Sequence, residues 1–192
     1  MLLCIKSVVM KFFVWPFLLL FAFYTGNAQY RNIEIKAAGL TCSLCSNAIQ
    51  KALKGLPFIA SIDTELKSNV FRIALKPGMP VNFDLISRKV EEAGFSIGEL
   101  TVEVKFPAAA IANDAHVEAN GQLFHFMNVK PGQVAGWQKV KLLDKSFVLQ
   151  PEAKKLAKAT RFACYKTGFM ESCCSEKTEV KVSPRRVLHV TI

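Results

Sequence analysis

The sequence has only one long apolar run. Residues 1–28 contain no acidic residue and hold the apolar stretch 12–23, whereas no later stretch of the 192-residue chain approaches the ~18 consecutive apolar residues of a membrane-spanning helix. The chain also lacks a phosphate-binding glycine-rich loop, a serine or cysteine triad arrangement and a carboxylate pair at a recognisable spacing. These absences exclude a polytopic membrane protein, and we expect that the protein is not an enzyme.

Acidic residues are few relative to basic ones, with 15 Asp and Glu against 25 Lys and Arg, and the formal charge is +10. The excess is concentrated after residue 106, where a basic cluster comprises Lys154, Lys155, Lys158, Arg161 and Lys166. No aromatic-basic binding motif accompanies it, so we expect no nucleic-acid partner. A solvated helix face is the simplest interpretation, and an acidic surface or partner is the alternative.

The apolar run has the layout of a secretory signal peptide. Lys6 and Lys11 precede it, and Thr25-Gly26-Asn27-Ala28 places small residues before a cut after Ala28. We therefore expect residues 1–28, including Cys4, to be removed on export to an extracytoplasmic compartment, and the remainder not to be an integral membrane protein. The alternative is an uncleaved anchor. Translation from Met10 instead of Met1 would leave a more typical leader.

Residues 30–106 predict an α+β unit of the ferredoxin-like type, with the order βαββαβ. Alternating polarity predicts strands, and apolar positions three and four residues apart predict helices. The expected strands are 31–37, 59–66, 70–75 and 97–106; one helix runs from about Cys45 to a stop at Gly55, and the other from Asp84 to Gly94. Two βαβ halves with helices on one face of a four-stranded sheet define this architecture.

The chemistry of this unit lies at Cys42 and Cys45. Two cysteines three positions apart, where a loop enters a helix, direct their sulfurs to one place, and the helix N-terminus favours thiolate over thiol. Two soft ligands suit a low-coordination ion such as Cu(I), whereas a closed zinc site uses four. A lone CxxC is also used in thiol–disulfide exchange and in half zinc sites, so these alternatives stay open.

The segment resembles the heavy-metal-associated domain family, which includes copper chaperones, modules of metal-transporting P-type ATPases and the periplasmic mercury-binding protein. The resemblance covers about residues 30–106 and rests on Gly39-Leu-Thr-Cys-Ser-Leu-Cys45, the helix that follows, and Glu92-Ala-Gly-Phe95. It implies that Cys42 and Cys45 hold the metal and that Phe95 shields the site, although Phe95 also fits a plain core position. Leu40 replaces the usual Met of the family.

We therefore expect an exported protein that binds and transfers or sequesters a soft metal through this cysteine pair. Cu(I) is the first choice and Hg(II) the second, with Zn(II) also considered, and the partner is a protein that offers thiolate ligands. An envelope thiol–disulfide redox protein is the alternative. A further reading is an interaction module whose metal domain is vestigial.

The remainder resembles no family that we recognise. We expect a linker over 107–115 and a small mainly-β domain over 116–192, in the form of a partly open barrel. Asn120-Gly121 is a strong hairpin signal between 116–119 and 122–126. Further strands are expected at 140–143, 146–149 and 161–165, a short helix at 151–160, and a closing hairpin of 179–182 with 187–192.

Cys164, Met170, Cys173 and Cys174 lie in this second part. They predict either a second soft-metal site or a disulfide of Cys164 with Cys173 or Cys174, and we favour the disulfide because small exported domains often need one. The three histidines, His116, His125 and His189, lack metal-ligand spacing, and we expect them to be ordinary sheet residues.

Overall fold

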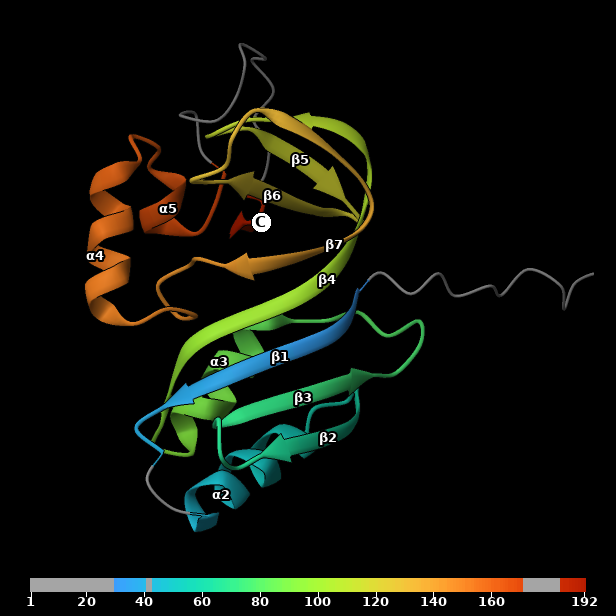
Figure 1. The fold of residues 1–192 in the computed structure, drawn as a ribbon, viewed down its shortest axis with the longest axis vertical. Coiled ribbons are helices and arrows are strands. Elements are labelled where there is room, and N and C mark those ends of the chain that lie inside the picture. Colours follow the sequence, from blue (N-terminus) through green and yellow to red (C-terminus); the bar gives the residue numbers. More distant parts are fainter. Residues whose placement is uncertain (1–29, 41–42, 171–183) are drawn as a thin grey trace, which may run out of the picture.

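The computed structural model describes residues 30–40, 43–170 and 184–192. These residues form an eight-stranded sheet in the order β2-β3-β1-β4-β7-β8-β6-β5 (Figure 1). The strands are β1 (Tyr30–Ala38), β2 (Ile59–Glu65), β3 (Val70–Leu75), β4 (Ser96–Ile111), β5 (His116–Ala119), β6 (Gln122–Phe126), β7 (Gly132–Leu142) and β8 (Val187–Thr191). The helices are α2 (Ser43–Lys54), α3 (Phe83–Glu92), α4 (Gln150–Ala159) and α5 (Cys164–Thr167).

The first unit has the predicted ferredoxin-like fold. Its strands lie in the order β2-β3-β1-β4 with all neighbours antiparallel, and α2 and α3 cover one face (Figure 1). The predicted apolar stripe of α2 supplies two fully buried side chains, Ile49 and Leu53. Helix α3 begins at Phe83, one residue earlier than expected, because Asn82 caps it: the Asn82 side chain accepts the Leu85 N–H at 3.0 Å. Asp84 lies in the first turn of this helix.

Strand β4 joins the two parts of the molecule. It continues through residues 107–111, where the sequence predicted the start of a linker, and pairs with β7 along its length. A register shift between Phe106 and Ala109 accommodates Pro107, which has no N–H to donate to the ladder. The predicted linker therefore begins as strand, and the sheet passes from one part to the other without a break.

The second part contains the predicted hairpin of β5 and β6, whose turn residues Asn120 and Gly121 both have positive φ angles of 55° and 74°. Strand β8 lies between β6, to which it is parallel, and β7, to which it is antiparallel. The Asn120 side chain donates to the Lys105 carbonyl of β4 at 3.3 Å, so the sheet curls back toward β4.

Two predicted strands of this part are wrong. Residues 146–149 form turns, since Phe147 N–H bonds back to the Asp144 carbonyl at 2.8 Å. Residues 161–165 lead into the short helix α5. The helix predicted at 151–160 is present as α4, with Pro151 in its first turn. The expected strand 179–182 lies outside the described residues.

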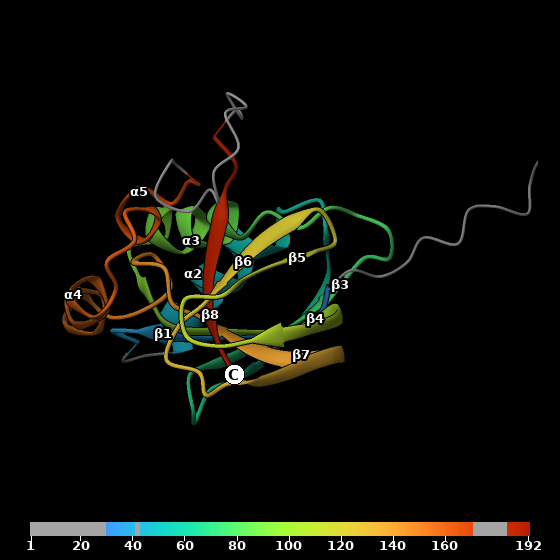
Figure 2. The same ribbon diagram turned by 90° about the horizontal axis from the view of Figure 1, so that it is seen from above.

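A continuous apolar core runs through both parts. Phe106 of β4 meets Phe124 and Phe126 of β6 at ring-centroid distances of 5.1 and 5.5 Å, and this group belongs to the same cluster as Ile49 and Leu53. A smaller apolar cluster joins Ala153 and Leu156 of α4 to Tyr165 of α5. Both helices lie at one side of the second part (Figures 1 and 2). Within the described segments, no helix combines the length and apolar character needed to cross a membrane.

Candidate functional site

The first candidate site lies at the start of α2. Cys45 is in the first turn of this helix and is half-buried, and Leu44 beside it is exposed. The four N–H groups of a first helical turn and the helix dipole stabilise a negative sulfur at such a position. Cys45 is disulfide-bonded. Cys42 lies outside the described residues.

The helix that carries Cys45 is firmly attached to the sheet. Besides the buried Ile49 and Leu53, the Gln50 side chain donates to the Ile62 carbonyl of β2 at 3.3 Å. Leu40 and Phe95, the two neighbours singled out from the resemblance, are partly buried and pack against the main core. The shielding role of Phe95 stays a prediction.

The second candidate site lies around Cys164, at the start of α5. Its thiol is fully buried, and Met170 packs partly buried against the same small cluster. Cys173 and Cys174 lie outside the described residues, so the predicted disulfide with them, or metal site including them, stays a prediction.

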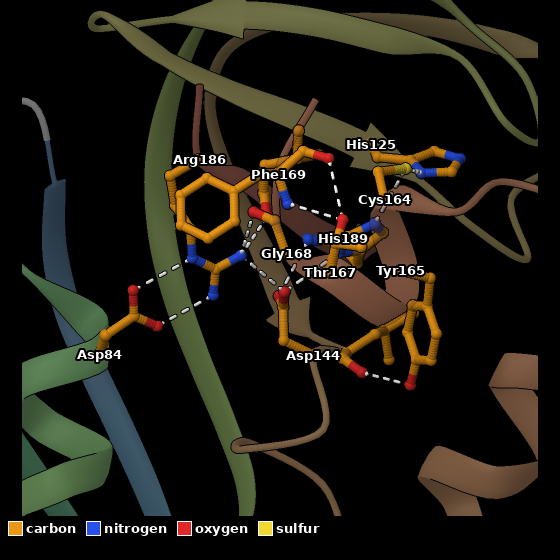
Figure 3. Close-up of polar contacts among 12 residues, drawn as sticks. Asp84, His125, Asp144, Cys164, Tyr165, Thr167, Gly168, Phe169, Arg186 and His189 are labelled. Carbon is orange, nitrogen blue, oxygen red and sulfur yellow. Dashed lines mark hydrogen bonds and ion pairs between the residues drawn. The ribbon is translucent and has the colours of Figure 1, made fainter. Parts of the chain in front are cut away.

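What surrounds Cys164 in the structure is histidine. Its Sγ lies 3.5 Å from His125 Nδ1 and 3.5 Å from His189 Nε2 (Figure 3). Both imidazoles are fully buried, and His116 stacks on His125 at a centroid distance of 4.4 Å. The three histidines are sheet residues, as expected, but the sheet brings them together at one thiol.

Part of this arrangement was readable from the sequence. A two-residue turn at Asn120-Gly121 fixes the hairpin register, which makes His116 and His125 direct cross-strand partners. Nothing local indicates His189 or Cys164, because sixty residues (127–186) separate the end of β6 from the start of β8. Asp114 and Asp144, which bond to the histidines, gave no signal either.

Each buried histidine has its own carboxylate. His125 Nε2 lies 3.0 Å from Asp114 Oδ1, and His189 Nδ1 lies 3.0 Å from Asp144 Oδ1. Burial lowers the pKa of His125, and the neighbouring His116 and His189 lower it further against the opposing effect of Asp114, so its imidazole is neutral near pH 7.

Asp144 is the more strongly held of the two carboxylates. It is 5% exposed, accepts the His189 backbone N–H at 3.0 Å and pairs with Arg186 at 2.9 Å. Burial alone raises the pKa of Asp144, but the hydrogen bond and charge of His189 and the charge of Arg186 outweigh it, so the net pKa lies below its usual range. The carboxylate is therefore ionised at neutral pH.

The first site lies in a segment that matches a known family. Residues 34–96 match the model of the heavy-metal-associated domain. This segment is a heavy-metal-associated domain. Among solved structures, the chain is similar to the yeast copper transporter domain CCC2A, with 28% identity, coverage of 35% of this chain and 90% of that one, and a TM-score of 0.31.

Two further solved structures are similar over the same part. One is a copper binding domain from HMA7, a P-type ATPase, with 29% identity, 35% and 92% coverage of the two chains and a TM-score of 0.31. The other is a copper form of CopA from Bacillus subtilis, with 22% identity, 36% and 90% coverage and a TM-score of 0.32. No curated protein gives a significant match.

The heavy-metal-associated domain contains Cys42, Cys45 and Phe95, whereas its family match ends before β4 leaves the first unit. The two candidate sites therefore differ in origin and chemistry. The first site has Cys45 in the first turn of α2, whereas the site around Cys164 offers one sulfur and imidazole nitrogens in the interior.

Proposed function

We propose that the reduced protein binds one soft metal ion, Cu(I) first and Hg(II) second, between Cys42 and Cys45, and hands it to a partner. The observation that carries this proposal is the heavy-metal-associated domain at residues 34–96, which includes both cysteines and places Cys45 in the first turn of α2. The first turn of a helix supports a thiolate ligand, and the attachment of α2 to the sheet fixes the position of Cys45.

The number and type of ligands favour Cu(I). Cu(I) is soft and accepts two thiolates, whereas zinc in closed protein sites uses four ligands. Cys45 is half-buried, so a bound ion stays within reach of another protein's sulfur. Transfer then proceeds by ligand exchange: a partner thiolate bonds to the ion, one metal–sulfur bond to this chain breaks, and the second exchange follows.

Such transfer requires no general acid, no nucleophile and no change of oxidation state, so we propose a binding protein and not an enzyme. The partner chemistry it implies is a second thiolate pair. The leader-like residues 1–28 support a location outside the cytoplasm. Because Cys45 is disulfide-bonded here, the pair must be reduced by a thiol reductant before it binds metal.

The test is a Cu(I) titration of protein reduced under anaerobic conditions, with a competing chelator. We expect the Cys42→Ser/Cys45→Ser variant to bind about one ion per chain fewer than the unaltered protein. Leu44→Ala is the matched control, since Leu44 lies between the two cysteines in the sequence and has an exposed side chain, and the substitution should leave the number of bound ions unchanged. Equal binding by the double variant and the unaltered protein would overturn the proposal.

The disulfide of Cys45 supports a second candidate function, a thiol–disulfide redox protein. This function predicts metal-free turnover in a disulfide-reduction assay, with loss of turnover in Cys45→Ser. Turnover without Cu(I) binding would favour the redox function, and Cu(I) binding without turnover favours the metal function.

A further inference from the structure

The second part of the fold gathers four potential metal ligands on three adjacent strands and one helix. His116, His125 and His189 are successive cross-strand partners on β5, β6 and β8, so their side chains line one face of the sheet. Cys164, at the start of α5, lies against His125 and His189 of this row (Figure 3). Ligand atoms of His116, His125 and Cys164 all lie within 4.8 Å of one another.

The spacing of the donor atoms fits a single ion. Bonds of about 2.0 Å to an imidazole nitrogen and about 2.3 Å to sulfur, at the tetrahedral angle, separate the two donors by about 3.5 Å. The two nitrogen–sulfur distances, from Cys164 Sγ to His125 Nδ1 and to His189 Nε2, are both 3.5 Å. Each of these two nitrogen–sulfur pairs therefore has the spacing that an ion bound to both of its atoms would require.

The protons also favour an ion at this place. A carboxylate accepts hydrogen bonds, so Asp114 and Asp144 favour the tautomers in which His125 Nε2 and His189 Nδ1 carry the ring hydrogen. The other nitrogen of each ring then presents a lone pair to Cys164 Sγ. One S–H group can satisfy only one of these two lone pairs, whereas a metal ion satisfies both and the thiolate together.

The arrangement around each ring is the one that metal-ligating histidines use. A ligand histidine almost always donates its second N–H to a carboxylate or carbonyl, which fixes the tautomer and the ring orientation. Asp114 does this for His125 and Asp144 does it for His189. Arg186 in turn holds Asp144 by a hydrogen bond of 2.9 Å.

From these contacts we infer that His125 Nδ1, His189 Nε2 and Cys164 Sγ form a second metal site, specific for a first-row ion that accepts nitrogen and sulfur together, namely zinc or copper. His116 stacks on His125 at the edge of this group. Its Nε2 is buried, and no hydrogen-bond partner for it lies among the described residues. This site is independent of the one proposed at Cys42 and Cys45, since none of its ligands belongs to the heavy-metal-associated domain.

The same contacts contain a Cys164–His189–Asp144 series in the geometry of a nucleophilic triad. Burial argues against that use, because Cys164 and His189 are both 0% exposed and a substrate cannot reach the sulfur. An ion needs far less room, and His116 at the outer edge of the row is only partly buried. Burial also excludes competing water ligands, which favours the protein's own donors.

The test isolates Cys164 without altering the cluster. In a chain with serine at positions 4, 42, 45, 173 and 174, Cys164 is the only cysteine that remains. We expect this chain to bind about one Co(II) per molecule, with a thiolate-to-metal charge-transfer band that Zn(II) removes by displacement. A folded chain without this band would overturn the inference.

Variants of the same chain identify the ligands. His125→Ala and His189→Ala should each abolish the band, whereas Met170→Leu is the matched control, since it alters a neighbour of Cys164 that lies outside the proposed ligand set and should keep the band. Loss of the band in Met170→Leu, or its persistence in either histidine variant, would contradict the ligand set. Titration with Cu(I) and Zn(II) then decides which ion is bound more tightly.

A measurement on the unaltered protein covers the case in which these variants do not fold. Addition of Zn(II) should shift the ¹⁵N resonances of His125 Nδ1 and His189 Nε2, the nitrogens that face the sulfur, far more than those of the carboxylate-bound nitrogens. Unchanged histidine resonances at saturating Zn(II) would count against the site.

Discussion

The guanidinium group of Arg186 forms two hydrogen bonds with the carboxylate of Asp84, at 2.9 and 3.0 Å, in a bidentate pair (Figure 3). Asp84 belongs to α3 of the heavy-metal-associated domain, and Arg186 immediately precedes β8. The same guanidinium bonds to Asp144, which in turn holds His189. A chain of charged contacts therefore runs from the surface of the first unit to the proposed second metal site.

We predict that Arg186→Met lowers the free energy of unfolding by about 3–5 kcal/mol, because it leaves the buried carboxylate of Asp144 without its cation. Asp84→Ala should cost below about 1 kcal/mol, since Asp84 is 57% exposed and water replaces its contact. Chemical denaturation of both variants measures the two values.

Arg185→Met is the matched control for this comparison. Its guanidinium pairs at 3.0 Å with Glu118, which is 54% exposed, and the expected cost is below about 1 kcal/mol. Equal losses of stability for the two adjacent arginines would show that the buried network contributes little.

Gly168 sets the position of the same guanidinium. Its φ angle is +77°, and a Cβ added there would lie 3.3 Å from Arg186 Nη1. We predict that Gly168→Ala costs about 1–2 kcal/mol of unfolding free energy, from the left-handed backbone together with displacement of Arg186. In Gly132→Ala the nearest atom to the added Cβ is 3.9 Å away, so this control should cost less than half as much. Thermal unfolding of both variants measures the two losses.

The sequence correctly predicted the elements that depend on patterns of residues close together in the chain. The α2 stripe of Ile49 and Leu53 and the Asn120-Gly121 turn each depend on residues a few positions apart, and the structure has both elements as predicted. The errors arise where tertiary contacts decide. Residues 146–149 are apolar enough for a strand, but Phe147 and Val148 are buried in the turn and bend that lead into α4.

The candidate site shows the same division. Cys42 and Cys45 are three positions apart and form a motif that the sequence alone reveals. His125, Cys164 and His189 come together only through the parallel pairing of β6 with β8 and the placement of α5. Asp144 joins them from a loop. A buried cluster built from four separated segments has no sequence spacing to detect, so its discovery required the fold.

We predict that Asp114→Asn weakens metal binding at the proposed second site about tenfold, because an amide oxygen makes the His125 imidazole a poorer donor than a carboxylate does. The fold should be retained, since Asn tolerates the positive φ of 65° at this position. Competition between Co(II)-loaded protein and a chelator measures the affinity. Glu118→Gln, a carboxylate change on the neighbouring strand, should leave it unchanged, and a similar loss in both variants would point to a general charge effect.

Phe106 tests whether the two parts of the molecule unfold together. Its ring lies on β4 and meets Phe124 and Phe126 within the core that both parts share, so we predict that Phe106→Ala costs about 3–5 kcal/mol and shifts a single transition. In a Trp15→Phe background, Trp137 on β7 is the only tryptophan and reports on the second part, while far-ultraviolet circular dichroism reports on all helices and strands. The two signals should give coincident denaturation curves before and after the substitution. Separate midpoints, with only the tryptophan signal moved by Phe106→Ala, would show instead that the heavy-metal-associated domain unfolds independently of the strands that extend its sheet.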